Sequence, residues 1–86
     1  MASYEIVFKK SVAKDLRRLP KQDIKRILEK IRGLGDDPRP PGAEKLSGLE
    51  RYRLRQGIYR IVYEIEDAVL TVVVVKVAHR REVYRS

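Results

Sequence analysis

The chain contains no cysteine, no tryptophan, and only one methionine and one histidine. The absence of cysteine excludes disulfide bonds, thiol nucleophiles and cysteine-based zinc sites. A single histidine, with no HExxH motif and no acid pair at ligand spacing, argues against a metal site, a Ser/His/Asp triad and a two-histidine ribonuclease. A glycine-rich phosphate loop is also missing. Arginine and tyrosine are therefore the residues left to carry chemistry.

Long apolar runs are missing as well. The run Val72 to Val75 falls far short of the ~20 residues that span a bilayer, and the N-terminus has no apolar signal-peptide core. A cysteine-free chain fits a reducing compartment, so we expect a soluble, cytoplasmic protein with no membrane partner. With 86 residues and 43% hydrophobic side chains, the chain is expected to form one domain over residues 1–86.

Positive charge is what the sequence has in excess. Twenty lysines and arginines against twelve aspartates and glutamates give a formal charge of +8. Such a density favours a polyanionic partner, with nucleic acid first and an acidic protein or an anionic membrane surface after it. A merely solvated basic surface is the alternative.

The first third of the sequence indicates one strand and two helices. Residues 3–9 alternate apolar and polar side chains, which is typical of a strand with one apolar face. Ser11 is placed to cap a first helix, and Pro20 ends that helix and opens the second. The charged outer face of the second helix is interpreted as solvated. Its apolar stripe, which stops near Gly33, consists of Ile24, Ile27, Leu28, Ile31 and Leu34.

The second half indicates a meander of three strands, at residues 50–56, 58–65 and 69–78. The aliphatic run at residues 70–75 predicts a central strand that is covered on both sides. Together these elements predict an α+β fold. An N-terminal strand and a helical hairpin precede an antiparallel three-stranded meander, in an antiparallel or mixed sheet with both helices on one face.

The register of the first predicted hairpin decides which side chains share a face. An even-numbered loop places Arg55 beside Arg60 and puts Arg53 on the same face, without a carboxylate in that cluster. Like charges that lie directly opposite are destabilising, so the cluster indicates an anionic ligand; an ordinary basic surface is the alternative. The inward face receives the tyrosines, which are interpreted as core: Tyr52, Tyr59 and Tyr63.

Four motifs resemble the RelE-like toxins of the RelE/ParE toxin-antitoxin superfamily. They lie at residues 45–49, 52–55, 57–64 and 79–84, and the resemblance covers almost the whole chain. It implies a type II toxin with a cognate antitoxin protein. It also implies an mRNA interferase, an endoribonuclease that acts in the ribosome without metal or cofactor and uses the 2'-hydroxyl of the mRNA as nucleophile. The same scaffold resembles ParE-like toxins, which inhibit DNA gyrase.

The resemblance also assigns roles to residues. Strand parity places Arg60 on the exposed face, and the resemblance implies that it stabilises the scissile phosphate, with Arg80, or Arg81 in its place, as the second arginine. The full set of catalytic candidates is Arg53, Arg55, Arg60, Arg80 and Tyr84, and the RNA-binding candidates are Arg53, Arg55, Arg81, Lys45 and His79. The segment at residues 46–49 is interpreted as packing.

One departure from the family leaves the general base open. Related ribonucleases often carry lysine where this chain has Arg53 and Arg55, and arginine, with a pKa above ~12, cannot serve as a base. Tyr84 can orient or deprotonate the hydroxyl, stack on a base or simply pack. His79 can transfer a proton or be structural. Two rival functions therefore stay open, a gyrase-directed toxin and a non-catalytic RNA- or ribosome-binding module.

Overall fold

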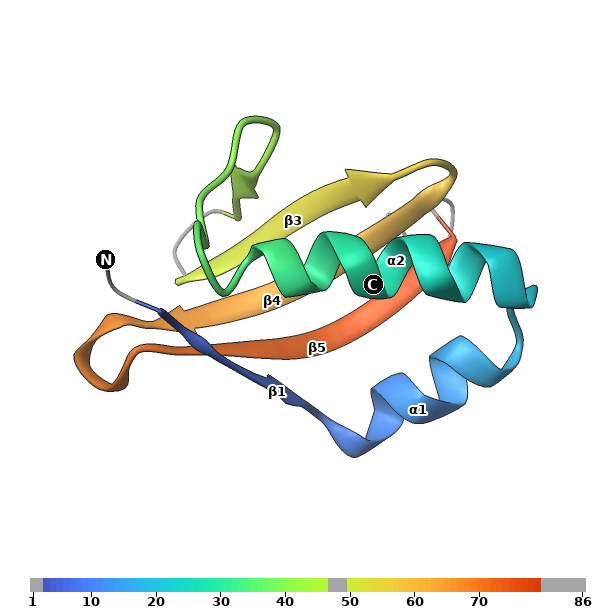
Figure 1. Ribbon diagram of the computed structural model, residues 1–86, viewed down its shortest axis with the longest axis horizontal. Coiled ribbons are helices and arrows are strands. Elements are labelled where there is room, and N and C mark those ends of the chain that lie inside the picture. The colour runs from blue at the N-terminus through green and yellow to red at the C-terminus, as the bar shows by residue number, and fades with distance from the viewer. Residues whose placement is uncertain (1–2, 47–49, 80–86) are drawn as a thin grey trace.

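The computed structural model describes residues 3–46 and 50–79 as one mixed sheet with two helices (Figure 1). The strand order is β1-β5-β4-β3-β2, in which β1 runs parallel to β5 and the other neighbours are antiparallel. The predicted α+β architecture is thereby confirmed. The elements are β1 (Glu5–Phe8), α1 (Lys10–Arg17), α2 (Lys21–Gly33), β2 (Glu44–Lys45), β3 (Arg51–Gln56), β4 (Tyr59–Glu66), the 3-10 turn η1 (Asp67–Val69) and β5 (Thr71–His79).

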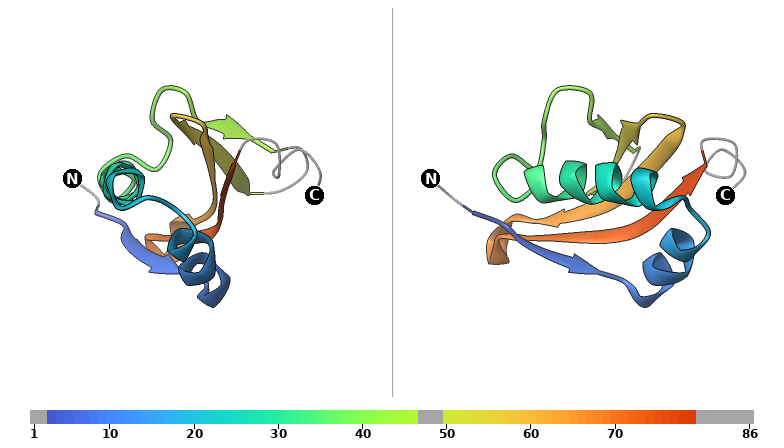
Figure 2. Two further views of the ribbon diagram at one scale, coloured as in Figure 1. Left: turned by 90° about the vertical axis from the view of Figure 1, so that its right-hand side faces the viewer. Right: turned by 45° about the vertical axis from the view of Figure 1, so that its right-hand side comes forward.

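Helix α2 lies along one face of the curled sheet (Figure 2), and the core fills the space between them. The stripe predicted for the second helix supplies Ile27, Ile31 and Leu34, all at most 1% exposed, while α1 contributes the fully buried Val12. Alternate residues of β3, β4 and β5 complete this core from the sheet side, because strand side chains alternate between the two faces. Among the described residues, neither helix has the length and apolar character that a membrane-spanning helix needs.

The helix ends were predicted correctly at Pro20 but not at Ser11. Pro20 is the N-cap of α2, as expected from its fixed φ and missing N–H. Ser11 lies inside α1, whose N-cap is Lys9 with no side-chain hydrogen bond. Strand β1 ends at Phe8, and the Lys9 N–H still donates to the Val74 carbonyl of β5. The helix therefore begins directly after Lys9, two residues earlier than a cap at Ser11 predicts.

The register of the β3–β4 hairpin is the one predicted. Gln56 pairs with Tyr59 across a two-residue turn, and Arg55 pairs with Arg60. Gly57 has φ +59°, a left-handed conformation that costs glycine little and that the tight turn requires. The turn therefore fixes the two faces of the hairpin on which the candidate site depends.

The expectation for residues 70–75 is confirmed in that β5 lies between two other strands, but it is wrong in that the strand is not covered on both faces. Along β5, Val72 and Val74 are fully buried, but Val73 and Val75 are only partly buried, because the helices cover one face of the sheet. The strand that is buried on both faces is β4, which runs from Tyr59 to Tyr63 without an exposed side chain. A register shift opposite β5 lies between Val62 and Tyr63.

Candidate functional site

The sheet face turned away from the helices carries a row of arginines, which we call the arginine face: Arg51, Arg53, Arg55 and Arg60. Strand alternation explains this placement, since Tyr52 and Leu54 between them pack in the helix-covered core. The cross-strand pair Arg55 and Arg60 puts two guanidinium groups on neighbouring strands. The prediction that Arg53, Arg55 and Arg60 share one face is therefore confirmed.

The depth of Arg60 differs from the prediction. Its side chain was expected to be exposed, but only 2% of the residue is accessible, next to Val62 at 7% and Ala78 at 4%. Parity determines the face of a strand residue, whereas its depth depends on what the neighbouring strands carry. Arg55 is exposed and makes no hydrogen bond or ion pair within the described part of the chain.

Two carboxylates compensate part of this charge, so the expectation of a cluster without a carboxylate is wrong. The Arg53 Nη2 lies 3.1 Å from Glu44 Oε2 on the short edge strand β2. Arg51 donates from Nε and Nη2 to Glu64 Oε2, at 3.1 and 2.6 Å. Arg51 lies at the end of β3 far from the turn, and Arg53 lies opposite Glu44 of β2. Arg55, next to the turn, makes no ion pair with a described carboxylate.

The opposite face of the same hairpin is built from tyrosines, as predicted. The Tyr59 hydroxyl donates to Asp23 at 2.8 Å, and the Tyr63 hydroxyl donates to the Pro38 carbonyl at 2.8 Å. The hydrogen bond to Asp23 raises the pKa of Tyr59, and burial raises the pKa of Tyr63 to about 12. These hydroxyls stay protonated at neutral pH, so they serve packing rather than proton transfer.

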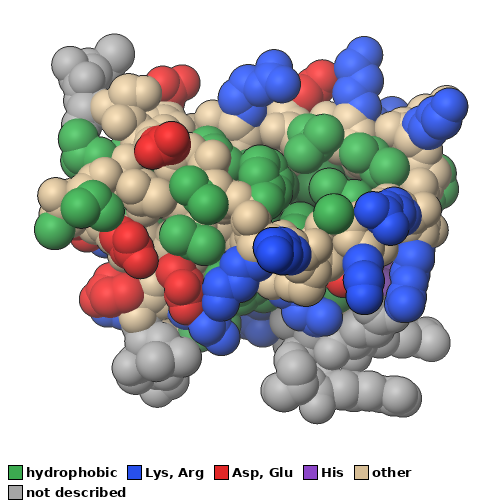
Figure 3. All heavy atoms as spheres, turned by 90° about the horizontal axis from the view of Figure 1, so that it is seen from below, with side chains coloured by type: hydrophobic (Ala, Val, Ile, Leu, Met, Phe, Trp, Pro, Cys, Tyr) green, Lys and Arg blue, Asp and Glu red, His purple; other side chains and the backbone are tan. Residues whose placement is uncertain are grey.

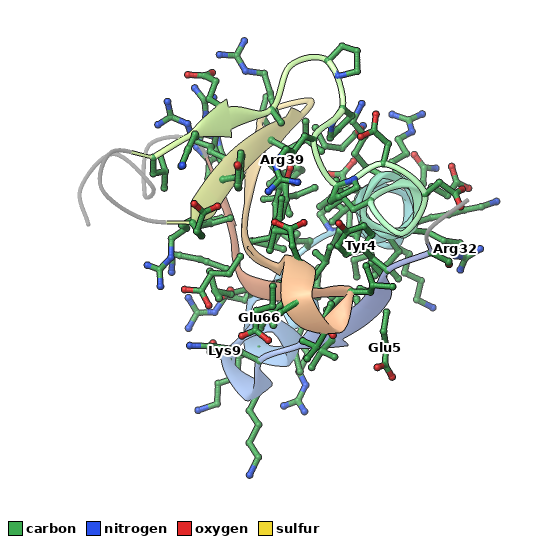
Figure 4. The ribbon with its side chains drawn as sticks, turned by 90° about the vertical axis from the view of Figure 1, so that its left-hand side faces the viewer. Tyr4, Glu5, Lys9, Arg32, Arg39 and Glu66 are labelled. Atoms are coloured by element: carbon green, nitrogen blue, oxygen red, sulfur yellow. The ribbon has the colours of Figure 1, made fainter. Side chains whose placement is uncertain are left out.

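Arg39 ties this tyrosine face to the β4–β5 turn. Its Nε donates to the Tyr52 hydroxyl at 3.0 Å, and its Nη2 lies 2.9 Å from Asp67 Oδ2. The Tyr4 hydroxyl donates to the same carboxylate at 2.6 Å, and Figure 4 shows Arg39 and Tyr4 near this turn. The hydrogen bond from Arg39 is the main reason that the pKa of Asp67 is lowered.

Two predicted RNA-binding residues do not share the arginine face. His79 pairs with Tyr59 across the strands and packs edge-on against its ring at 6.4 Å between centroids. Lys45 pairs with Tyr52, is exposed, and lies 3.1 Å from Glu50. Directly paired residues point to the same side of a sheet, so both belong to the helix side. The described structure therefore brings together only Arg53, Arg55 and Arg60 of the predicted set.

The remaining candidates, Arg80, Arg81 and Tyr84, lie outside the described residues, as does most of the segment at residues 46–49. Within the described ranges, no three histidine, cysteine, aspartate or glutamate side chains are grouped as metal ligands. Sequence reasoning missed Arg51, Glu64 and Glu44. Extending the predicted hairpin register by two residues would have paired Arg51 with Glu64. Nothing comparable pointed to Glu44, because β2 has only two residues.

The comparison with known proteins assigns this arrangement to a family. A family model described as the ParE toxin of the type II toxin-antitoxin system parDE matches residues 6–84. The chain belongs to this toxin family. Toxin RelG of Mycobacterium tuberculosis is 33% identical over 95% of this chain and 97% of its own length. These matches confirm the resemblance to RelE-like toxins of the RelE/ParE superfamily.

Solved structures agree with this assignment. The chain is similar to the toxin in the archaeal RelE-RelB complex from Pyrococcus horikoshii, with a TM-score of 0.79 and 28% identity over 91% of this chain and 96% of that chain. It is also similar to the isolated RelE toxin of Escherichia coli, with a TM-score of 0.77 and 28% identity over 96% of this chain and 93% of that chain. The fold is therefore that of RelE toxins, in both free and complexed relatives.

Proposed function

We propose that this type II toxin is a ribosome-dependent endoribonuclease that cuts mRNA without a metal, with the 2'-hydroxyl of the substrate as nucleophile. The observation that carries the proposal is the cross-strand pair of Arg55, which is exposed, and Arg60, which is 2% accessible, on the sheet face turned away from the helices. Two like charges on adjacent strands disfavour folding, and an anionic ligand offsets their repulsion. A phosphodiester is such a ligand, and only RNA supplies the 2'-hydroxyl.

The arginines suit the charge that develops during cleavage. Attack of the 2'-oxygen produces a phosphorane with additional negative charge, which preorganised cations stabilise more than they stabilise the ground state. A guanidinium group presents a planar fork to two phosphate oxygens and keeps its charge at any working pH. In the proposal, Arg55 and Arg60 contact the phosphate, and Glu44 holds Arg53 beside them.

Proton transfer needs other groups, because arginine neither accepts nor releases a proton in this range. The tyrosines of the described core are engaged in fixed hydrogen bonds and are unsuited to the task. We assign proton transfer or orientation of the 2'-hydroxyl to Tyr84, with Arg80 as a second cation and Arg81 as its substitute. The ribosome supplies the remaining alignment of the mRNA, which accounts for an incomplete acid-base set.

A cognate antitoxin belongs to the same proposal. The relative from Pyrococcus horikoshii was solved as a complex of RelE with RelB. A small domain of charge +8 gains stability from an acidic partner, both by relief of self-repulsion and by mass action. We propose that a separate acidic antitoxin chain covers the arginine face of this toxin and so blocks access of RNA.

The decisive experiment adds purified protein to a translation reaction, maps cleavage by primer extension, and assays gyrase supercoiling in parallel. The wild type should cut mRNA only on ribosomes and leave gyrase active. Gyrase inhibition without cleavage would favour the ParE-like alternative, and binding without either effect would favour a non-catalytic module. Efficient, metal-requiring cleavage of naked RNA would also contradict the proposal.

A matched pair of variants ties the activity to the arginine face. Arg55→Gln removes one exposed cation of the pair and should lower the cleavage rate roughly tenfold or more, since a hydrogen bond to a charged group contributes about 1.5 to 3 kcal/mol. Lys30→Gln removes the same charge from the exposed surface of α2. Equal rates for the two variants would show that only general electrostatics is at work.

A further inference from the structure

The excess positive charge is concentrated at one end of the molecule. Residues 9–26, which we call the basic corner, contain eight lysines and arginines and two aspartates, a net +6 out of the chain's +8. They span the start of α1 to the first turns of α2. Figure 3 shows the blue side chains gathered toward this end, while the red ones gather toward the end that carries Glu5 and Glu66 (Figure 4).

Both aspartates of the basic corner point into the protein. Asp15 Oδ2 accepts a hydrogen bond from the Val77 N–H at 3.2 Å, and Asp23 Oδ2 accepts the Tyr59 hydroxyl at 2.8 Å. The pairing of β1 with β5 ends at Phe8 and Val74, so the edge of β5 has no partner strand at Val77. Asp15 accepts the N–H of Val77 at this point. These carboxylates are therefore committed to the sheet, and the outer surface of the corner is left with cations.

The eight cations of the basic corner are all exposed, and none forms an ion pair with another described residue. Elsewhere, four described cations pair with carboxylates, namely Arg39, Lys45, Arg51 and Arg53. Lys30, Arg32 and Arg55 are exposed without such a pair, but they are not gathered in one segment as the eight of the corner are. A surface that was merely solvated would gain from interspersed acids like those of the four pairs. The corner instead accumulates self-repulsion, which an external polyanion relieves.

The basic corner also lacks the features of a protein-binding surface. Its apolar side chains pack toward the core, as Val12 and Leu16 do. The large apolar residues that the described chain does expose lie outside residues 9–26. Protein interfaces depend on buried aromatic and aliphatic anchors at their centre. Phosphate recognition requires only cations and polar donors.

We propose that the basic corner binds the phosphodiester backbone of a nucleic acid, at a surface separate from the arginine face. The corner lies on α1 and the start of α2, whereas the arginine face is the open side of the sheet. Contacts of this kind are independent of base sequence, because phosphates carry no sequence information. The corner holds the toxin on a structured nucleic acid while the arginine face remains available to a single strand. Binding at the corner does not depend on the cleavage chemistry.

The test measures duplex binding by purified full-length protein without ribosomes. A fluorescein-labelled 20-bp RNA duplex and the matching DNA duplex are titrated by anisotropy over a series of salt concentrations. The corner variant is Lys14→Gln/Arg17→Gln, at two exposed positions of α1. The control is Lys30→Gln/Arg32→Gln, which removes the same charge at the far end of α2. Glutamine keeps a helix propensity close to that of lysine and arginine.

The corner variant should reduce the slope of log K against log salt by about 1.8, because each lost phosphate contact contributes about 0.9. The control should leave the slope near the wild-type value. Binding of both duplexes supports recognition of the shared backbone, and tighter binding of RNA identifies it as the preferred source.

Equal changes of slope in the two variants would overturn the proposal. Poly-glutamate that competes as well per charge as the duplex would also overturn it and would favour an acidic protein. A wild-type protein that binds the duplex but cuts no mRNA would contradict only the proposed nuclease activity. Failure of the corner proposal is therefore distinguishable from failure of the proposed function.

Discussion

The two faces of the β3–β4 hairpin are made by alternate residues of the same two strands, yet the polar groups of the two faces find their partners in opposite ways. On the helix side, the hydroxyls of Tyr52, Tyr59 and Tyr63 each have a fixed partner within the protein. On the open side, Arg51 and Arg53 have carboxylates, whereas Arg55 has no described partner. The tyrosine hydroxyls on the helix side therefore hold the fold, whereas the guanidinium group of Arg55 is available to an external partner.

The same comparison explains why the three tyrosines of this hairpin serve as core residues. A buried tyrosine contributes a large apolar area and needs one partner for its hydroxyl. Arg39 supplies such a partner and also lies over the Tyr52 ring, 5.4 Å from its centroid. The tyrosine face is therefore a closed structural layer, and changes in it should affect stability before activity.

We expect the largest effect from a change on the arginine face, at Arg60. Arg60→Gln keeps most of the buried stem and removes one preorganised donor to the phosphorane. We expect cleavage on the ribosome to fall roughly 100- to 1000-fold, or about 2.7 to 4 kcal/mol. Rates are compared with those of Lys30→Gln, measured by primer extension on protein whose circular-dichroism spectrum is native. A rate equal to that of the control would remove Arg60 from the reaction.

Because Arg60 is only 2% exposed, its replacement should also lower the free energy of unfolding. Loss of packing around the stem accounts for this cost, which we expect to be on the order of 1 kcal/mol. Urea titration separates it from the loss of activity. A variant that loses activity only in proportion to its unfolded fraction would contradict a role at the phosphate.

A smaller effect is expected on the tyrosine face, where the free energy of unfolding should depend on alkaline pH. Burial raises the pKa of Tyr63 to about 12, above the value near 10 of the unfolded chain. The stabilisation is complete below pH 10 and is lost as the pH rises through about 12, to the extent of on the order of 2 kcal/mol. Tyr63→Phe should remove this part of the pH dependence in urea titrations from pH 8 to 12. An unchanged alkaline slope in the variant would exclude Tyr63 as its source.

We expect the smallest effect on the free energy of unfolding at acid pH, through the Asp67 carboxylate that Arg39 contacts. The hydrogen bonds from Arg39 and Tyr4 keep the pKa of Asp67 below its ordinary value of 3.8. This stabilisation is complete above that value and is lost as the pH falls through the lower pKa of the folded state. Asp67→Asn should flatten the loss of stability between about pH 5 and pH 2. Asp36→Asn, which removes another exposed carboxylate, serves as the control and should keep the wild-type slope.

The sequence predicted what depends on local pattern. The alternation around Gly57 determines the hairpin register, and the turn length then assigns every side chain of β3 and β4 to a face. The stripe from Ile24 to Leu34 determined the buried side of α2 in the same way. These features follow from chain geometry over a few residues, so one sequence is enough to find them.

What depends on distant segments was not predictable in this way. The burial of Arg60 does not follow from strand alternation, and the ion pair of Arg53 depends on the two-residue strand that carries Glu44. The inward bonds of Asp15 and Asp23 are likewise made to residues 36 or more positions away. Helical periodicity alone gives no sign that these two carboxylates accept hydrogen bonds from the sheet.

The parallel pairing of β1 with β5 has a consequence for how the chain folds. It joins Glu5 to Thr71, whereas the β3–β4–β5 meander and the two helices are connected locally. Contacts of high sequence separation are costly to close and form late. Strand β1 must therefore wait for β5, the last described strand, before it has a partner. During translation the two helices emerge before the sheet that they cover is complete, and the sheet gains β1 only after β5 has emerged.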